Sequence, residues 1–214
     1  MITCHLKVKA VLFDLDGTLV DTLEFVYQAY EFTLKTHKLK SVSRKVLGTL
    51  IGKEITAIYN MIAPGFDAST LIKTHNDFQN KKMDLIESYP EVEQVVKKIK
   101  KMGIKMGVVT SRLRNSKETL EVAGLGGLFE VIISAEDVTH HKPHPECVLL
   151  ALKKLKVKAT DAILVGDSSF DIQTGKNAKV KIVGVTYGFF GESIKESNPD
   201  FIIDKLEEIL KIIQ

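Results

Sequence analysis

Four aspartates lie where an apolar run gives way to a polar turn. Asp14 and Asp16 follow the run VKAVLF in the stretch FDLDGTLVD, and Asp167 and Asp171 follow a second run in GDSSFD. Clustered carboxylates raise each other's pKa, so they are unfavourable together unless a cation is bound. Oxygen ligands of this kind suit Mg²⁺ rather than zinc, and Mg²⁺ would in turn neutralise a bound phosphoryl group.

A hydroxyl and a cation complete this set of groups. Thr110 ends the run IKMGVVT, and the amide of Ser111 precedes a helical stretch whose backbone N–H groups would receive an anion. Lys142 stands next to Pro143 and close to Pro145, which fix a rigid loop that presents the lysine. A lysine beside phosphate and carboxylates acts as a charge clamp. Together these residues predict a phosphoryl-transfer site.

Short apolar runs rich in β-branched residues predict the buried strands that carry these groups. Helical patterns lie between most of the runs and include PECVLLALKKL, with Pro145 at its first helical position, and the tail LEEILKII. The alternation favours an α/β fold with a parallel sheet, and ligands bind beyond the carboxyl ends of such strands. The six predicted strands are residues 8–14, 104–110, 129–134, 162–167, 180–186 and 200–204.

One long interruption separates the first two strands. From Val20 to about Glu87 the sequence has helical patterns and no convincing strand, and roughly 65 residues is far too long for a single crossover helix. We therefore expect an inserted helical subdomain over residues 20–88, with the α/β core formed by residues 1–19 and 89–214. Asp21 is expected to cap its first helix, because Glu24 lies at capping-box spacing. Two more helices are expected at 53–62 and at about 67–86.

Composition and charge indicate a soluble globular protein. The chain has 214 residues, 44% of them hydrophobic and 27% charged, which suits one large domain or a core with an insertion. A net charge of +3 is too balanced to indicate a nucleic-acid or membrane partner. Cys4 and Cys147 form no CxxC motif, and no signal or spanning segment is evident, so a cytoplasmic location is expected. The oligomeric state, monomer or homodimer, stays open.

The chain resembles the haloacid dehalogenase (HAD) superfamily in four motifs that occur in order. The segment DLDGT at 14–18 resembles the first motif, Thr110 the second, Lys142 in KPHP the third and GDSSFD at 166–171 the fourth. The helical insert lies where that family has its cap domain. The resemblance implies a three-layer, Rossmann-like parallel-sheet core with an all-helical cap. The chain is similar to the phosphoglycolate phosphatase group, and TSRLRNS and KPHPE resemble its pyrophosphatase branch.

The resemblance also implies a role for each site residue. Asp14 would be the nucleophile that forms an aspartyl-phosphate, and Asp16 would protonate the leaving oxygen and then activate water. An acid at position 16 fits phosphate hydrolysis better than carbon–halogen chemistry. Mg²⁺ would be held by Asp14, the backbone carbonyl of Asp16 and Asp167, with Asp171 binding or orienting, while Thr110 and Lys142 would hold the phosphoryl oxygens.

The function that follows is a Mg²⁺-dependent phosphatase acting on a small phosphorylated metabolite, with phosphoglycolate as the family default. An inorganic pyrophosphatase of the same family is one alternative. A β-phosphoglucomutase-like phosphomutase is another, and a non-catalytic binding protein on the same fold is more remote. No feature of residues 20–88 decides between them.

Other polar residues have simpler readings. Asp171 suits the N-terminus of a helix, a role that is compatible with the site. The KKIKK run at 97–101 reads as a solvated helix face, and Arg44 and Lys53 as surface residues. Lys179 stands where the family often has glycine, so the turn there is expected to differ. Three histidines match no helical zinc pair, so we favour no metal site there: His140, His141 and His144.

Overall fold

The chain forms two compact units. The computed structural model describes residues 6–112 and 115–214. Within these, residues 6–21 and 87–214 form the core unit and residues 22–86 the cap unit. The insertion expected at residues 20–88 is therefore two residues longer at each end than the cap unit. The reason is a short antiparallel pair, β2 (Val20–Asp21) with β3 (Glu87–Ser88), which ties both ends of the insertion to the core unit.

The core unit is built on one six-stranded sheet in which every neighbouring pair is parallel. All six predicted strands are present, in the order β5-β4-β1-β6-β7-β8. The central strand β1 is fully buried, as its unbroken apolar sequence requires. The strands are β1 (Ala10–Phe13), β4 (Lys105–Val109), β5 (Val131–Ile133), β6 (Ala162–Gly166), β7 (Lys181–Val185) and β8 (Phe201–Ile203).

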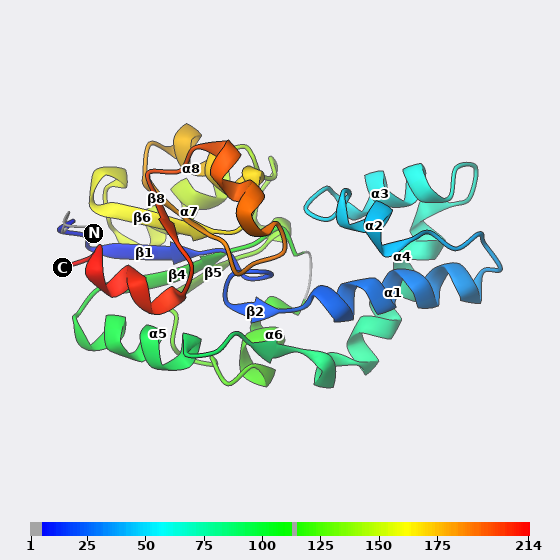
Figure 1. Cartoon of the computed structure of the whole chain (residues 1–214), viewed down its shortest axis with the longest axis horizontal. Coiled ribbons are helices and arrows are strands. Elements are labelled where there is room, and N and C mark those ends of the chain that lie inside the picture. The colour runs from blue at the N-terminus through cyan, green and yellow to red at the C-terminus, as the bar shows by residue number, and fades with distance from the viewer. Residues whose placement is uncertain (1–5, 113–114) are drawn as a thin grey trace. The chain divides into compact units, whose positions relative to one another are not determined.

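Helices cover both faces of this sheet, which gives the expected three layers. Figure 1 shows α7 and α8 on one face and α5 on the other. Apolar residues of α7, such as Val148 and Leu152, pack with Leu12 and Leu164 of the sheet in one buried cluster. The α/β prediction is therefore confirmed. The helices are α5 (Val92–Lys101), α6 (Ser116–Val122), α7 (Glu146–Leu155) and α8 (Ser169–Ala178).

Two details of the core unit differ from expectation. The tail is a 3₁₀ helix, η5 (Leu206–Lys211), and not an α-helix. Leu206 and Ile209 of this helix and Ile212 directly after it are buried at every third position, which fits the three residues per turn of a 3₁₀ helix. Pro145 is the residue before α7 and not its first helical residue.

The cap unit is helical, and its helices pack around their own apolar cluster. Tyr30, Leu47, Tyr59 and Leu71 are buried in it, and a hydrogen bond of 2.8 Å joins the Tyr59 hydroxyl to Nδ1 of the buried His75. The elements are α1 (Leu23–Thr36), α2 (Arg44–Gly48), α3 (Ile55–Ile62), α4 (Ala68–Lys81) and the 3₁₀ turn η1 (Met83–Leu85).

Two expectations for the cap unit were wrong. Asp21 lies in β2, and the residue that precedes α1 in the capping position is Thr22. The helix expected to run to Ile86 ends at Lys81, because Lys82 leaves the helical region at φ −125° and ψ 25°. The short helix α2 was not predicted. Its signal is Ser43, whose side chain accepts a hydrogen bond from the Val46 N–H.

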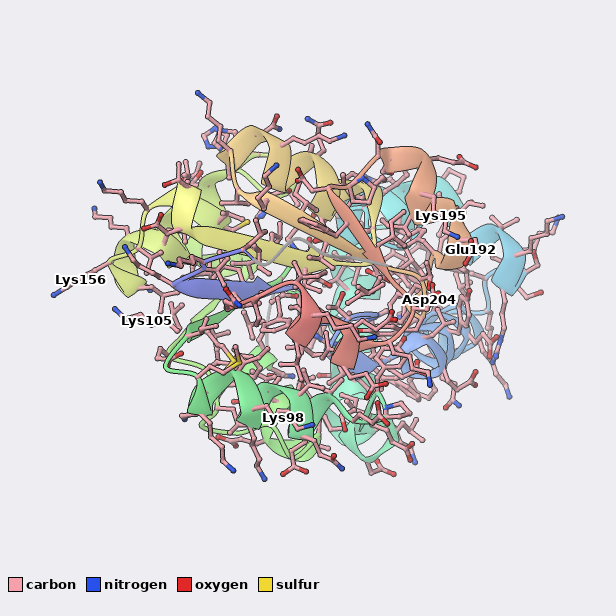
Figure 2. The ribbon with its side chains drawn as sticks, turned by 60° about the vertical axis from the view of Figure 1, so that its left-hand side comes forward. Lys98, Lys105, Lys156, Glu192, Lys195 and Asp204 are labelled. Carbon is pink, nitrogen blue, oxygen red and sulfur yellow. The ribbon has the colours of Figure 1, made fainter. Side chains whose placement is uncertain are left out.

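The charged surface agrees with the simpler readings. The four lysines of the KKIKK run are exposed on α5, and Figure 2 shows Lys98 on its outer side. In the cap unit, Lys53 is exposed and Arg44 pairs with Glu24 at 2.6 Å and with Glu31 at 2.8 Å. Lys195, also labelled in Figure 2, pairs with Glu192. No helix among the described residues has the length and apolarity needed to cross a membrane.

Candidate active site

The sheet register brings the predicted acids to one edge. Phe13 at the end of β1 pairs with Val108 of β4 and with Val165 of β6, so the turns after these strands begin side by side. Asp14 opens the first turn, and its N–H donates to the Val165 carbonyl at 2.8 Å. The turn needs Gly17, which has φ +82°, since a Cβ there would lie 2.2 Å from an oxygen of Asp167.

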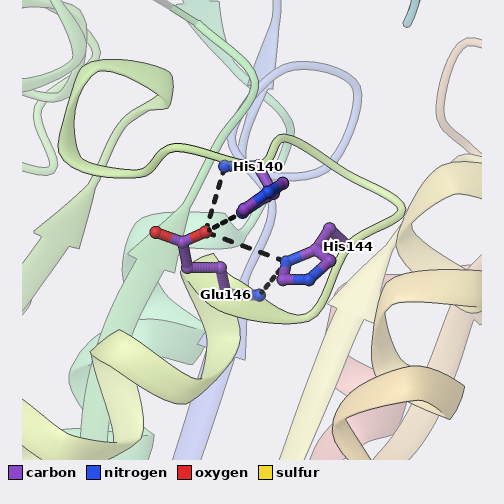
Figure 3. A group of neighbouring side chains, drawn as sticks. All are labelled: His140, His144 and Glu146. Carbon is purple, nitrogen blue, oxygen red and sulfur yellow. Dashed lines mark hydrogen bonds and ion pairs between the residues drawn. The ribbon is translucent and has the colours of Figure 1, made fainter.

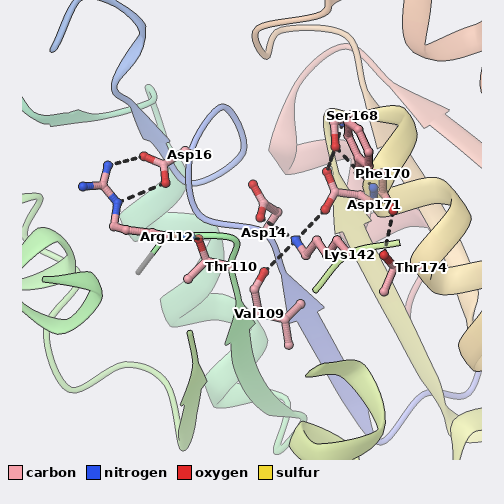
Figure 4. A network of polar contacts seen from close by, with 10 residues as sticks. All are labelled: Asp14, Asp16, Val109, Thr110, Arg112, Lys142, Ser168, Phe170, Asp171 and Thr174. Carbon is pink, nitrogen blue, oxygen red and sulfur yellow. Dashed lines mark hydrogen bonds and ion pairs between the residues drawn. The ribbon is translucent and has the colours of Figure 1, made fainter. Parts of the chain in front are cut away.

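Lys142 forms the centre of the polar network in Figure 4. Its Nζ donates to Oδ1 of Asp14 at 2.6 Å, to Oδ1 of Asp171 at 2.6 Å and to the Val109 carbonyl at 2.9 Å. Only 4% of its side chain is exposed. The three partners match the three N–H groups of an ammonium. The KPHP loop therefore delivers the lysine into the site, and the carbonyl of Pro143 is held by Asn177 at 2.9 Å.

Asp171 has both of the roles that its sequence position suggested. One carboxylate oxygen accepts from Lys142, and the other accepts from the N–H and the hydroxyl of Ser168 at 3.1 and 2.5 Å. Ser168 in turn accepts from the Asp171 N–H, which completes a capping box at the start of α8. Both oxygens of Asp171 have protein partners, so Asp171 orients Lys142, and any oxygen that it offers to a metal ion already accepts a hydrogen bond.

A group of three buried acids could hold a divalent cation. Asp14, Asp167 and Asp171 each offer an oxygen within 4.8 Å of the others. Asp167 is 2% exposed, and its Oδ2 accepts from the Phe189 N–H at 2.7 Å. These three carboxylates outnumber the single ammonium of Lys142 by two charges. All the possible ligand atoms are oxygens, and two further positive charges would balance the carboxylates, so the group fits Mg²⁺.

The pKa shifts of these groups follow from burial and crowding. Burial, reinforced by Asp171, raises the pKa of Asp14 to about 7 even though Lys142 acts to lower it. Burial, together with Asp171 and Asp14, raises the pKa of Asp167 well above its usual range. Burial acts to lower the pKa of Lys142, but Asp14 and Asp171 raise it above its ordinary value. Lys142 is therefore charged. A metal ion bound by the acids would relieve the repulsion between their carboxylates.

These shifts predict that the metal-free protein becomes less stable as pH rises. Asp14 and Asp167 have raised pKa values in the folded state, so the folded protein binds more protons than the unfolded chain. Their contribution to stability is present below the ordinary aspartate pKa of 3.8 and, for Asp14, is lost as pH rises through about 7. We expect Mg²⁺ to raise the melting temperature more at about pH 8 than at about pH 5. Thermal melts with Mg²⁺ and with chelator check this, and equal shifts at the two pH values would contradict it.

Thr110 and Asp16 complete the set of predicted residues. Thr110 directly follows β4 and is 3% exposed, and its hydroxyl accepts from the Arg112 N–H at 3.1 Å. The carboxylate of Asp16 lies outside the three-acid group, on the opposite side of Asp14 from Lys142 (Figure 4). Its side chain is 22% exposed and is paired with Arg112.

Arg112 is the site residue that the sequence reading missed. Its Nε donates to Oδ2 of Asp16 at 3.1 Å and its Nη2 donates to Oδ1 at 2.5 Å, a two-pronged pair across 96 residues of sequence. Only 9% of the Arg112 side chain is exposed. A usable signal existed, because a basic residue two positions after Thr110 must lie at the same edge of the sheet as Asp16.

The loop that carries Lys142 is closed by Glu146. Its two oxygens accept from the N–H groups of Thr139 and His140 at 2.9 and 3.0 Å, and one also meets Nδ1 of His140 at 2.9 Å (Figure 3). Donor atoms of His140, His144 and Glu146 lie within 4.8 Å of one another, so a divalent ion could be held there, although both histidines are exposed. These hydrogen bonds hold the pKa of Glu146 down at about 2. The carboxylate thus braces the loop.

We expect Glu146→Ala to lower activity without any contact between Glu146 and substrate. Two backbone N–H groups lose their acceptor, so the Lys142 loop becomes less well fixed, and kcat should fall roughly tenfold with a measurable loss of stability. Glu146→Gln keeps one carbonyl acceptor, so its kcat and its stability should lie between those of the wild type and of Glu146→Ala. Steady-state hydrolysis of an aryl phosphate and urea unfolding measure the two effects. Wild-type kcat in Glu146→Ala would contradict a positioning role.

Comparison with known proteins agrees with this geometry. The family model "Haloacid dehalogenase-like hydrolase" matches residues 11–185. Curated relatives named Pyrophosphatase PpaX, from Bacillus thuringiensis (strain Al Hakam) and Bacillus cereus (strain G9842), are 35% and 34% identical over 211 residues, which is 97% of this chain and of each relative.

Solved structures give the same result. A predicted phosphoglycolate phosphatase from Haemophilus somnus 129PT is 25% identical, with a TM-score of 0.87 over 96% of this chain and 97% of its own. A predicted phosphatase from Clostridium acetobutylicum is 26% identical, with a TM-score of 0.83 over 96% and 97%. The four strand-end motifs, the three-layer sheet and these matches lead to one conclusion: the chain belongs to the haloacid dehalogenase-like hydrolase family and is a phosphatase-type hydrolase.

Proposed function

We propose that this hydrolase is a Mg²⁺-dependent phosphatase of small anionic phosphate compounds that works through an aspartyl-phosphate on Asp14. The observation that carries the proposal is the shared contact of Lys142 with Asp14 and Asp171 beside the buried Asp167. It joins a nucleophile, a fixed cation and a divalent-cation site at one sheet edge. The division into core residues 1–19 and 89–214 and a substrate-selecting cap at 20–88, within the two-residue boundary shift given above, is part of the same proposal.

Each site residue then has one task. An oxygen of Asp14 forms a bond to phosphorus while the bond from phosphorus to the leaving oxygen breaks. Lys142 favours the ionised form of Asp14 and balances charge on the phosphoryl oxygens, and the Thr110 hydroxyl donates to one of them. Mg²⁺, when held by Asp14, the backbone carbonyl of Asp16 and Asp167, would supply further positive charge to the phosphoryl group. Asp171 keeps Lys142 in position.

Asp16 handles the protons. In the first half of the reaction its carboxyl group gives a proton to the leaving oxygen, which takes the electron pair of the broken bond. In the second half the same carboxylate accepts a proton from water as the water oxygen bonds to phosphorus and Asp14 is released. Inorganic phosphate and the dephosphorylated product are the net result, with one water consumed.

Two substrates have support as candidates. Relatives at 35% identity are named pyrophosphatases, and a structural neighbour at 25% identity is described as a predicted phosphoglycolate phosphatase. We rank inorganic pyrophosphate first, because the pyrophosphatases have the greater identity, over 97% of the chain. A mutase activity has no specific observation in its favour. We propose a cytoplasmic location on the composition argument given above.

A phosphate-release screen with Mg²⁺ tests the proposal. The panel contains pyrophosphate, phosphoglycolate, sugar phosphates, nucleotides and p-nitrophenyl phosphate. A thousandfold preference for one of them, about 4 kcal/mol in the transition state, would identify the substrate. Release of phosphate without any sugar-phosphate isomer would exclude the mutase. Failure to hydrolyse every member of the panel would favour a non-catalytic binding protein.

A further inference from the structure

The pair of Arg112 and Asp16 has a geometry that conflicts with the role of Asp16 as a proton donor. Both carboxylate oxygens of Asp16 accept from the guanidinium, at 3.1 and 2.5 Å. This forked arrangement suits an ionised carboxylate. A proton on either oxygen would remove the negative charge that strengthens both hydrogen bonds. While Arg112 holds Asp16 in this way, it therefore works against the protonated form that the leaving oxygen needs.

Arg112 loses the carboxylate partner of its fork when Asp16 becomes the acid. Its side chain is 9% exposed, so losing both hydrogen bonds of the fork would be costly unless another anion takes the place of Asp16. Its backbone is fixed at the site by the N–H donation to Thr110 at 3.1 Å, so only the side chain needs to move. A guanidinium binds carboxylate and phosphate with the same fork. An anionic group on the substrate would satisfy it.

The side of the site on which Arg112 lies indicates which part of the substrate this is. In Figure 4, Lys142 and Asp171 lie on one side of Asp14, while Asp16 and Arg112 lie on the other. The proposed function assigns the transferred phosphoryl group to Asp14 and Lys142, and the leaving oxygen to Asp16. A second anion beside Asp16 thus belongs to the leaving group.

We propose that Arg112 is a specificity-determining residue that binds an anionic leaving group, and that its transfer from Asp16 to this group frees Asp16 to act as the acid. The inference rests on the proposed function and adds a substrate class to it. The leaving group carries its own negative charge close to the scissile oxygen, as does the phosphate of pyrophosphate or the carboxylate of a phosphorylated hydroxy acid. An uncharged alcohol would leave Arg112 on Asp16.

The test compares substrates in one variant. The wild-type enzyme and Arg112→Gln are assayed with Mg²⁺ on pyrophosphate, phosphoglycolate and p-nitrophenyl phosphate, whose leaving group has no second anion. We expect the ratio of kcat/KM for either anionic substrate to kcat/KM for p-nitrophenyl phosphate to fall roughly 10- to 100-fold, the size of a charge-assisted hydrogen-bonded contact. Arg112→Lys keeps the charge but loses the fork, so its ratio should be intermediate.

Arg44→Gln is the matched control, since Arg44 also binds carboxylates through a fork but within the cap unit, to Glu24 and Glu31. Its ratio should stay at the wild-type value. An equal loss for all three substrates in Arg112→Gln would overturn the inference and make Arg112 a support for Asp16 alone. A wild-type enzyme with no preference for either anionic substrate would also overturn it. Neither result touches the proposed function, which fails if Asp14→Asn keeps its activity or if the wild-type enzyme hydrolyses no member of the panel.

Discussion

Asp14→Asn should abolish phosphate hydrolysis and leave the fold intact. The amide is nearly isosteric with the carboxylate but cannot form a stable bond to phosphorus, so we expect kcat to fall by about 10⁴-fold or more. Burial raises the pKa of Asp14 to about 7, so at higher pH the carboxylate is a buried charge that the amide removes. The melting temperature should therefore be at or above the wild-type value at about pH 8. Phosphate release and thermal melts measure both effects.

The control for this variant is Asp84→Asn, the same exchange at an exposed position of the cap unit. It should keep wild-type activity. Asp14→Asn with wild-type turnover would refute the nucleophile assignment. Loss of activity with a lowered melting temperature would be explained by misfolding, and circular dichroism of the variant separates that case.

A covalent intermediate gives this prediction a second readout. Acid-quenched wild-type enzyme should carry phosphate on Asp14 after brief exposure to p-nitrophenyl phosphate, and Asp14→Asn should carry none. Asp16→Asn should accumulate the phosphorylated form, because p-nitrophenolate leaves without a proton while the attacking water still needs a base. An Asp16→Asn enzyme that never becomes phosphorylated would contradict the division of labour between the two acids.

The strands and the polar residues that follow them were predictable because both are local in the sequence. A run such as VKAVLF is apolar at every position except Lys9, and this is typical of a strand that is covered on both faces. The register of β1 with β4 and β6 follows from burial of those runs, and it brings Asp14, Thr110 and Asp167 together without further information. Lys179 is the residue that stands where the family often has glycine. It takes the left-handed conformation, at φ +59°, in the position after α8.

What the sequence could not predict depends on side chains that meet across long stretches of chain. Arg112 pairs with Asp16 over 96 residues, and its position two residues after Thr110 indicates the edge of the sheet on which it lies but not this partner. Glu146 reads as an ordinary first-turn acid, but it closes the loop that carries Lys142. The sequence also left open where α4 ends and that the tail is a 3₁₀ helix. Local helix preferences are weak there, and packing decides the outcome. These residues determine how the site is held and what it selects.

Lys142→Met should damage both stability and catalysis, and the stability loss should grow with pH. The ammonium is the shared cation of Asp14 and Asp171, and breaking a buried ion pair from one side costs about 3–5 kcal/mol. At about pH 5 Asp14 is already protonated in the folded state, so the cost should be smaller there than at about pH 8. Hydrolysis should fall roughly 10²- to 10³-fold because the phosphoryl oxygens lose a fixed positive charge. Urea unfolding at both pH values and steady-state kinetics check this.

Two further variants separate the buried charge from other effects of the substitution. Lys105→Met is the control, because Lys105 donates to a backbone carbonyl, that of Leu155, at 2.7 Å. Its stability change should be small and independent of pH. The double variant of Lys142→Met with Asp14→Asn removes one of the carboxylates that lost its partner, so it should be more stable than Lys142→Met alone by about 1 kcal/mol or more. Mg²⁺ should also restore part of the stability of Lys142→Met, since it supplies positive charge to the same three acids. A loss that is equal at both pH values and unrelieved by either Asp14→Asn or Mg²⁺ would show that Lys142 stabilises the site by packing and not by charge.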